Sequence, residues 1–191
     1  ACLLVTPYYN KPNQKGLFEH YKTINDTVDI PQILYNVPSR TNCDLENQTI
    51  ISLSQFSNII GIKDATGQLD RINFLKEKVK NNFIFISGDD LSFLEYIERG
   101  GCGVISVTAN VKPDLMHNIC NSALNGDIEK SRSINRELTK LHKAMFVDSN
   151  PIPVKWLMTY LGLINKGIRL PLVELDKKYQ KTLIEIFEAI K

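Results

Sequence analysis

Few residues that bind metals or form disulfides occur in this 191-residue sequence. Its four cysteines (Cys2, Cys43, Cys102 and Cys120) form no Cys-x-x-Cys pair, and its three histidines are widely separated, so no metal site is expected. The formal net charge is only +2, and the basic residues are spread along the chain, which gives no polyanion-binding patch. No apolar run approaches the roughly 20 residues that a membrane span needs. These absences favour a reduced, cytoplasmic protein that binds neither nucleic acid nor membrane.

A regular alternation of strand-like and helix-like segments is present instead. Five short apolar runs each end on polar or turn residues, and segments with helical periodicity lie between them. A strand, a helix and two loops occupy about the length that separates successive runs, so the pattern predicts consecutive βα units. The expected strands cover residues 2–6, 32–36, 59–63, 83–87 and 103–107, and the expected helices between them cover 14–28, 46–56, 69–79 and 91–99.

The character of the sequence changes after the fifth expected strand. A helix is expected at residues 114–124, and the strand-like runs then stop. Amphipathic or proline-initiated segments at 127–146, 154–161 and 176–190 predict a tail of three helices. We therefore expect two parts, with five βα units in residues 1–125 and a C-terminal helical domain in residues 126–191.

Two architectures are built from βα repeats. A nucleotide-binding, doubly wound sheet would place a glycine-rich phosphate loop after an early strand, and none of the five strand ends carries one. A (β/α)8 barrel gathers its chemistry at the C-terminal ends of several strands, where this chain has polar residues. The predicted fold class is therefore α/β, as a partial (β/α)8 TIM barrel with a C-terminal helical tail. The chain opens inside a strand-like run, so we expect about three βα units, roughly 90 residues, to be absent and the chain alone to be inactive.

Lys63 ends the third apolar run, and a turn-like Asp-Ala-Thr-Gly segment follows it. Strands of parallel sheets are buried on both faces, so an ammonium at the strand end is expected to be partly desolvated. Desolvation favours the neutral amine, which can attack a ketone carbonyl and form a Schiff base. A lysine that merely extends into solvent is the simpler interpretation of this position taken alone.

Tyr35 ends the strand next to the one that carries Lys63, so the phenol and the amine can face one pocket. A tyrosine there can move protons between the intermediates of a Schiff-base reaction, although a tyrosine at the edge of a core is also common. Arg40 follows in a loop that Pro38 stiffens, and a fixed guanidinium suits bidentate binding of a carboxylate. A solvated loop arginine is the alternative for Arg40.

Three segments contain or flank these residues: 5–12 (VTPYYNKP), 34–41 (LYNVPSRT) and 61–67 (GIKDATG). In these segments the chain resembles the dihydrodipicolinate synthase family. Three further segments fit the same family, at 87–90 (SGDD), 101–110 (GCGVISVTAN) and 150–155 (NPIPVK). The match runs along the whole chain but covers only the C-terminal two-thirds of the family.

The resemblance implies a lyase that condenses pyruvate with L-aspartate 4-semialdehyde in lysine and diaminopimelate biosynthesis, without a metal or cofactor. It implies that Lys63 forms the imine, that Tyr35 donates and accepts protons, and that Tyr9 completes the relay in a neighbouring subunit. Arg40 would hold the semialdehyde carboxylate, and the site would also include Gly88 and the backbone of Ile105, which contacts pyruvate. Tyr8 matches one residue of the site for L-lysine as feedback inhibitor, and the family forms homotetramers.

Two rival interpretations remain open at this point. Another class I pyruvate-type aldolase of the same superfamily, such as N-acetylneuraminate lyase or a 2-keto-3-deoxy acid aldolase, would share the lysine and the tyrosine. The Ser39-Arg40-Thr41 continuation favours the dihydrodipicolinate enzyme over these. A non-catalytic, ligand-sensing protein on the same fold is the rival from another class, and trapping of an imine with pyruvate would separate it from an enzyme.

Overall fold

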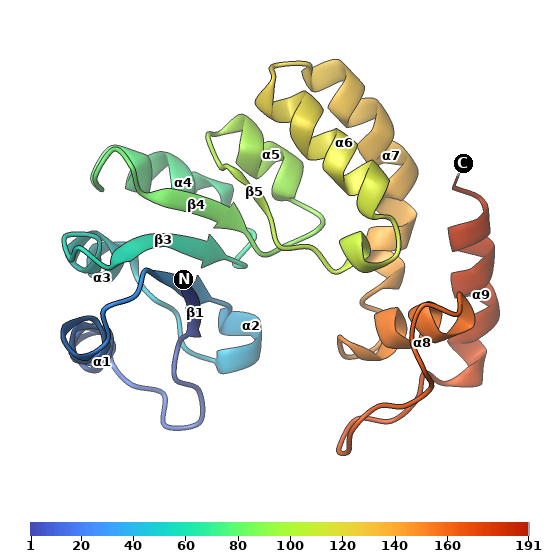
Figure 1. Ribbon diagram of the computed structural model, residues 1–191, viewed down its shortest axis with the longest axis horizontal. Helices are drawn as coiled ribbons and strands as arrows, with labels where there is room; N and C mark the ends of the chain where they lie inside the picture. The colour runs from blue at the N-terminus through green and yellow to red at the C-terminus, as the bar shows by residue number, and fades with distance from the viewer. Residues whose placement is uncertain (191) are drawn as a thin grey trace. The chain divides into compact units, whose positions relative to one another are not determined.

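The computed structural model describes residues 1–190. Its internal contacts divide the chain into two compact units, Ala1–Ile105 and Ser106–Lys191, here called unit 1 and unit 2. Each unit is described by itself below (Figure 1). The boundary between the βα units and the helical domain, expected near residue 125, is not the same as this division by contacts, and it stays a prediction.

Unit 1 contains a parallel sheet in which the strands follow one another in chain order, β1-β2-β3-β4-β5. In the central pair, Leu34 of β2 lies opposite Ile62 of β3, and Tyr35 lies opposite Lys63. The apolar runs of the sequence thus form the expected parallel strands, because each run is short, β-branched and bounded by turn residues. The strands are β1 (Cys2–Val5), β2 (Gln32–Asn36), β3 (Ile59–Asp64), β4 (Ile84–Ser87) and β5 (Gly103–Val104).

Helices connect the strands of unit 1 and cover the outer side of the sheet (Figure 1). Fully buried Leu34 and Ile62 of the sheet share a core with Leu17, Ile50 and Ile72 of three helices. Burial of such side chains contributes roughly 1.5–3 kcal/mol each and fixes the sheet against the helices. The helices are α1 (Gln14–Thr27), α2 (Pro38–Thr41), α3 (Asn47–Leu53), α4 (Leu69–Lys76) and α5 (Phe93–Glu98).

The segment after β2 was expected to be a loop, and this was wrong. Pro38–Thr41 forms one helical turn, α2, at the arrowhead end of the sheet (Figure 1). Pro38 suits a first helical position because its φ is already helical and its missing N–H needs no partner there. Asn42 ends the turn in the left-handed region, with φ 51°.

Two further expectations need correction at the end of unit 1. The fifth strand is only Gly103–Val104, although the N–H of Ile105 still donates to the carbonyl of Ser87 at 3.0 Å. Pairing ends there because the chain turns into a short 3-10 helix, Thr108–Asn110. The helix expected at residues 91–99 also begins later than expected, since α5 starts at Phe93, and Asp89 accepts hydrogen bonds from the backbone N–H and the hydroxyl of Ser92.

Unit 2 is helical, as expected. Helices α6 (Pro113–Leu124) and α7 (Ile128–Ala144) pack together through buried Ile119, Leu138 and Leu141. Asp127 caps α7 by accepting from the N–H of Lys130 at 3.2 Å. The tail ends with α8 (Ile152–Tyr160) and α9 (Lys177–Glu188). Within residues 1–190, no helix combines the length and the apolar character required to cross a membrane.

Candidate active site

Lys63 lies near the carboxyl end of β3, and only 8% of it is exposed. Burial is the main effect on this side chain, and it lowers the pKa of the Lys63 ammonium below its usual value. The negative charge of Asp90, itself buried, acts in the opposite direction. The net result is a larger fraction of neutral amine near pH 7 than an exposed lysine would have, and the neutral amine is the nucleophilic form.

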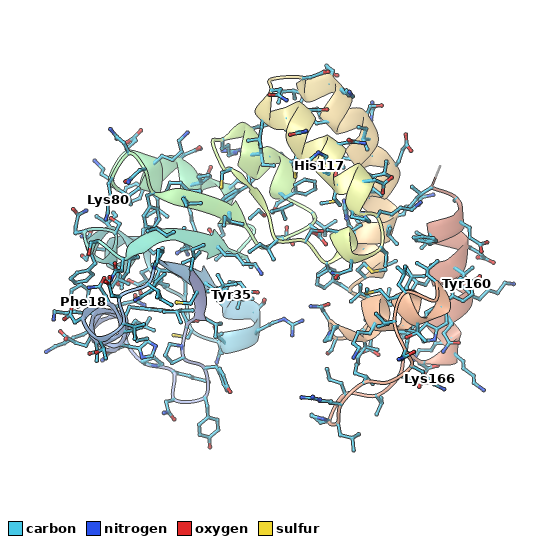
Figure 2. All side chains as sticks on the ribbon, in the orientation of Figure 1. Phe18, Tyr35, Lys80, His117, Tyr160 and Lys166 are labelled. Carbon is cyan, nitrogen blue, oxygen red and sulfur yellow. The ribbon has the colours of Figure 1, made fainter. Side chains whose placement is uncertain are left out.

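Tyr35 lies directly across from Lys63 on β2. Paired residues of neighbouring strands project from the same face of a sheet, and the Lys63 Nζ lies 4.1 Å from the centroid of the Tyr35 ring. Burial raises the pKa of the Tyr35 phenol, and the positive charge of Arg40 opposes this shift. Tyr35 therefore holds its proton at neutral pH and can donate it to a reacting group. Figure 2 shows Tyr35 at the end of the sheet where α2 begins.

Arg40 is exposed on α2, near enough to Tyr35 to act on the pKa of its phenol. The turn that carries it is tied down by buried Thr41, whose hydroxyl donates to the carbonyl of Cys43 at 2.9 Å. The hydroxyl of Thr6, after β1, lies 3.2 Å from the Thr41 hydroxyl. An exposed guanidinium on a braced turn can bind the carboxylate of a ligand that approaches the strand ends.

Gly88 lies against the side chain of Lys63. A β-carbon at this position would lie 2.9 Å from the Lys63 Cε and 2.7 Å from the Ala65 Cβ. The absence of a side chain at Gly88 therefore makes room for the lysine stem. The Gly88 N–H donates to the carbonyl of Asp64 at 2.7 Å, which also ties the start of this loop to β3.

Ile105 and the two tyrosines after β1 are placed differently from Lys63. Ile105 is 47% exposed, and its N–H is engaged by Ser87, so a ligand contact from its backbone would use the carbonyl. Tyr8 is 65% exposed and Tyr9 is 87% exposed. The structure thus brings Lys63, Tyr35, Arg40 and Gly88 together, and leaves Tyr8 and Tyr9 directed into solvent.

A charged network around Arg71, next to Lys63 in the fold, was not predicted from the sequence. Arg71 of α4 is buried, and its Nη1 lies 3.0 Å and 2.9 Å from the two carboxylate oxygens of Asp44. Its Nε lies 3.9 Å from the Oδ2 of Asp64, the residue after Lys63. No sequence pattern connects Arg71 with Asp44, because these residues meet only through the packing of α4 on the chain after α2.

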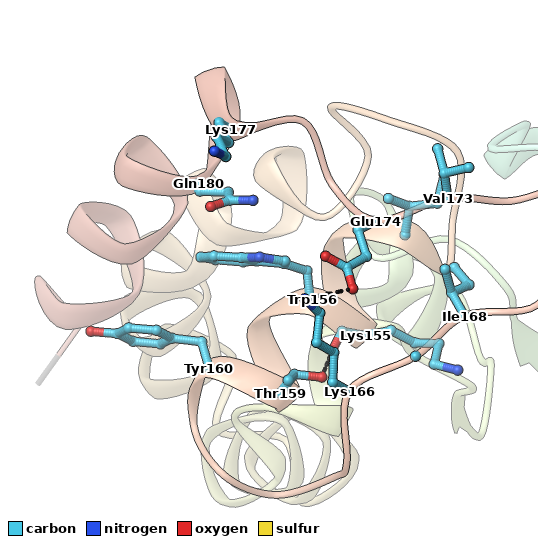
Figure 3. A pocket seen from close by; sticks show the side chains of 12 residues that line it. Lys155, Trp156, Thr159, Tyr160, Lys166, Ile168, Val173, Glu174, Lys177 and Gln180 are labelled. Carbon is cyan, nitrogen blue, oxygen red and sulfur yellow. Dashed lines mark hydrogen bonds and ion pairs between the residues drawn. The ribbon is translucent and has the colours of Figure 1, made fainter.

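Unit 2 contains a hollow with a volume of about 320 Å³ (Figure 3). It lies between α8, α9 and the chain that joins them. Trp156 and Tyr160 stack in its wall with ring centroids 5.8 Å apart, and Lys166 pairs with Glu174 at 3.2 Å. Lys155, the last residue of the NPIPVK segment, also lines it and is half-buried. Within residues 1–190, no group of three or more His, Cys, Asp or Glu side chains could hold a metal ion.

Parallel strands joined by helices, with a buried lysine at the end of a central strand, define this chain as a βα-repeat protein of the TIM-barrel type. The chain belongs to the Dihydrodipicolinate synthetase family, whose family model matches residues 1–190.

The similarity extends to named relatives. The 4-hydroxy-tetrahydrodipicolinate synthase of Buchnera aphidicola subsp. Acyrthosiphon pisum (strain APS) is 56% identical over 173 residues, 90% of this chain and 59% of that protein. The corresponding protein of Buchnera aphidicola subsp. Cinara cedri (strain Cc) is 52% identical, over 100% of this chain and 65% of that protein. The chain thus spans about 59–65% of the length of these relatives.

Solved structures of dihydrodipicolinate synthases are also similar to this chain. Chloride-inhibited dihydrodipicolinate synthase from Acinetobacter baumannii, complexed with pyruvate, is 45% identical with a TM-score of 0.95, over 98% of this chain and 65% of that one. The enzyme from Aquifex aeolicus is 41% identical with a TM-score of 0.95, over 97% of this chain and 64% of that one. The predicted fold class, a partial TIM barrel of βα units followed by helices, is confirmed.

Proposed function

We propose that the chain carries the Schiff-base lysine of a 4-hydroxy-tetrahydrodipicolinate synthase, which condenses pyruvate with L-aspartate 4-semialdehyde in lysine and diaminopimelate biosynthesis. The observation that carries the proposal is Lys63, buried at the end of β3 with its amine 4.1 Å from the Tyr35 ring centroid and with a lowered pKa. The family, the named relatives and the neighbour complexed with pyruvate support the same reaction.

The reaction begins with attack of the neutral Lys63 amine on the ketone carbon of pyruvate. Loss of water from the carbinolamine gives an imine, and loss of a methyl proton gives an enamine whose terminal carbon is nucleophilic. This carbon attacks the aldehyde carbon of the second substrate, and the aldehyde oxygen takes up a proton. The amine of the semialdehyde then attacks the imine carbon, closes the ring and releases Lys63. Tyr35 donates and accepts protons in these steps, because it is protonated at neutral pH and lies beside the amine.

The second substrate is held by Arg40 through its carboxylate. An exposed guanidinium on the α2 turn, close to Tyr35, suits a carboxylate whose aldehyde must reach the enamine. Gly88 provides the space beside the Lys63 stem, and the Ile105 carbonyl contacts pyruvate. No cofactor takes part in these steps.

The exposed tyrosines act between subunits. We propose that Tyr9 reaches the site of a neighbouring subunit in a homotetramer, and that Tyr8 contributes to a site for L-lysine as feedback inhibitor. Their exposures of 87% and 65% leave the rings available for contacts outside this chain. One solved relative, from Cyanidioschyzon merolae, has lysine bound, and another is a monomeric variant.

The cysteines of the described residues are all unpaired, which supports a reducing cytoplasmic location.

Assays of purified protein test the proposal. The sample, here called the test enzyme, is the full product of the gene that encodes residues 1–191. If that product has no further residues, the sample is a chimera of this chain with the rest of the Cinara cedri relative. We expect pyruvate-dependent consumption of aspartate semialdehyde and no cleavage of N-acetylneuraminate or 2-keto-3-deoxygluconate. If the test enzyme cleaves either sugar acid with a higher kcat/KM than it shows for the condensation, the chain belongs to that aldolase instead. If a folded test enzyme turns over none of these substrates, the result favours a ligand-sensing protein.

We also propose that a polypeptide of residues 1–191 alone is inactive. This chain covers only 65% of the Cinara cedri relative, and within the described residues β1 and β5 are edge strands of an open sheet. Leu3 and Val5 of β1 are 42% and 41% exposed, so this edge carries apolar side chains as well. Ordinary turnover by the 191-residue polypeptide would contradict this proposal.

A further inference from the structure

Buried Arg71 is the centre of an ionic network in unit 1 that the proposed reaction does not use. Its guanidinium contacts both carboxylate oxygens of Asp44, at 3.0 Å and 2.9 Å, and donates through Nη2 to the carbonyl of Leu45. Such a fork of donors fits an arginine and cannot be reproduced by a lysine. Arg71 therefore holds the chain at residues 44–45 against α4.

The same two residues are also bound to the end of β2. The side-chain amide of Asn36 donates to the Oδ1 of Asp44 at 2.7 Å, and the Leu45 N–H donates to the Oδ1 of Asn36 at 3.0 Å. The intervening residues, 37–43, are thus closed into a loop whose two ends meet at this network. This loop contains α2 and Arg40.

A third arm of the network reaches β3. The Nε of Arg71 lies 3.9 Å from the Oδ2 of Asp64, and Asp64 is the register partner of Asn36. Side chains alternate along a strand, so Asn36 and Asp64 project away from the face that Tyr35 and Lys63 share. The network consequently joins the ends of β2 and β3 on the face of the sheet opposite to the Lys63 amine and the Tyr35 phenol. Through its carbonyl, Asp64 also accepts a hydrogen bond from the N–H of Gly88 at 2.7 Å.

We propose that Arg71 is a positioning residue, which acts on the second substrate through the loop of Arg40. This inference rests on the proposed function, because it assigns Arg71 a part in the geometry of that site. Arg71 does not touch substrate. It fixes residues that are next to Tyr35 and Lys63 in the chain or that close the loop of Arg40.

The substitution Arg71→Met in the test enzyme measures this role. A loosened α2 loop should raise the KM for aspartate semialdehyde about ten- to a hundredfold, while the KM for pyruvate changes by less than about threefold. A purely structural arginine would instead lower the folded fraction and leave both KM values unchanged. Arg71→Lys keeps the charge but loses the fork, so it should give a smaller rise in the same KM.

Two further variants make the test specific. Arg99 pairs with exposed Asp70 at 3.5 Å at the surface of unit 1, so Arg99→Met is the matched control and should leave both KM values unchanged. If Arg71 acts through Arg40, then Arg71→Met should raise the KM of an Arg40→Ala variant far less than it raises that of the unsubstituted enzyme. Asp44→Asn offers a milder disturbance of the network if Arg71→Met does not fold.

The outcomes separate the two proposals. An unsubstituted test enzyme that forms no imine with pyruvate would overturn the proposed function. An enzyme that forms the imine, but whose Arg71→Met and Asp44→Asn variants keep the KM for the semialdehyde, would overturn only the role of Arg71. The role of Arg71 would also be overturned if the effects of Arg71→Met and Arg40→Ala on the KM for the semialdehyde were fully additive in the double variant.

Discussion

Unit 1 and unit 2 differ in where they hold charge. Within residues 1–190, the buried lysine, arginine and aspartate side chains are Lys63, Asp64, Arg71 and Asp90, and each lies in unit 1. The buried polar side chains of unit 2 include Thr108 and His142, which are joined by a hydrogen bond of 2.7 Å. Burial of charge costs free energy and is often found where a function needs a shifted pKa. The comparison therefore points to unit 1 as the place of the chemistry.

Lys63 and Lys155 show the same contrast at the level of single residues. Both lie in segments that resemble the same family, so the motifs alone do not distinguish them. Lys63 is buried at a strand end beside Tyr35, whereas Lys155 is half-buried on α8 at the wall of an open hollow (Figure 3). The burial of Lys63 beside Tyr35, rather than its motif, is therefore what favours Lys63 as the nucleophile.

Among substitutions that compare the Lys63 site with the rest of the core of unit 1, Tyr35→Phe is expected to have the largest effect on kcat. Loss of the phenolic proton should lower kcat of the test enzyme by about 10²–10⁴-fold with little change in stability. Tyr21→Phe is the matched control, since Tyr21 is a buried core tyrosine on α1, and it should leave kcat unchanged. Similar kcat values for the two variants would remove Tyr35 from the mechanism.

A smaller effect is expected at the substrate-binding turn. Arg40→Ala should raise the KM for aspartate semialdehyde far more than the KM for pyruvate. Loss of a charge-assisted hydrogen bond of about 1.5–3 kcal/mol corresponds to roughly ten- to a hundredfold. Steady-state kinetics with each substrate varied in turn give both constants. Equal changes in the two constants would mean that Arg40 only supports the fold.

One substitution made at two glycines should have opposite effects on the free energy of unfolding. Gly88→Ala places a methyl group 2.7 Å from the Ala65 Cβ and 2.9 Å from the Lys63 Cε, so it should destabilise the protein by about 1–3 kcal/mol. Gly16→Ala lies in helix α1 with its nearest neighbours at 3.4 Å and 3.5 Å, and should stabilise it by about 0.5–1 kcal/mol. Urea unfolding of both variants gives the two values. A stable Gly88→Ala variant with normal activity would show that the lysine stem does not need this space.

The smallest effect concerns the stability cost of the buried amine. The pKa of Lys63 is lowered in the folded protein, so between that pKa and the ordinary 10.5 the unfolded chain binds more protons and stability rises with pH. Lys63→Met removes this penalty, and we expect its Tm to exceed that of the unsubstituted protein at pH 7. The gain should shrink as the pH approaches 10, and the charge left on Asp90 offsets part of it. A Tm difference that does not depend on pH would contradict the lowered pKa.

Much of the fold could be predicted from the sequence because its apolar runs are short and regularly spaced. The strands around Leu34 and Ile62 followed from this pattern, as did the change to helices after the fifth run. The prediction was wrong at β5, where pairing ends after Val104, and at Pro38–Thr41, where a proline segment interpreted as a loop forms a helical turn. Both differences depend on a few backbone angles that hydrophobic periodicity does not specify.

The candidate site was predictable only in part. Lys63, Tyr35 and Arg40 could be selected because they end neighbouring strands or follow them directly. The contact of Arg71 with Asp44 could not, since it depends on how α4 packs on a loop 27 residues earlier in the chain. The steric role of Gly88 likewise becomes visible only when the Lys63 side chain is placed.

Borohydride trapping tests the central claim most directly, namely that Lys63 rather than Lys155 is the nucleophile. The test enzyme is incubated with pyruvate, reduced and digested, and the modified lysine is identified by peptide mass spectrometry. We expect one reduced pyruvyl adduct, on Lys63, which is lost in Lys63→Ala and retained in Lys155→Ala. An adduct on Lys155, or no adduct on a folded enzyme, would contradict the account.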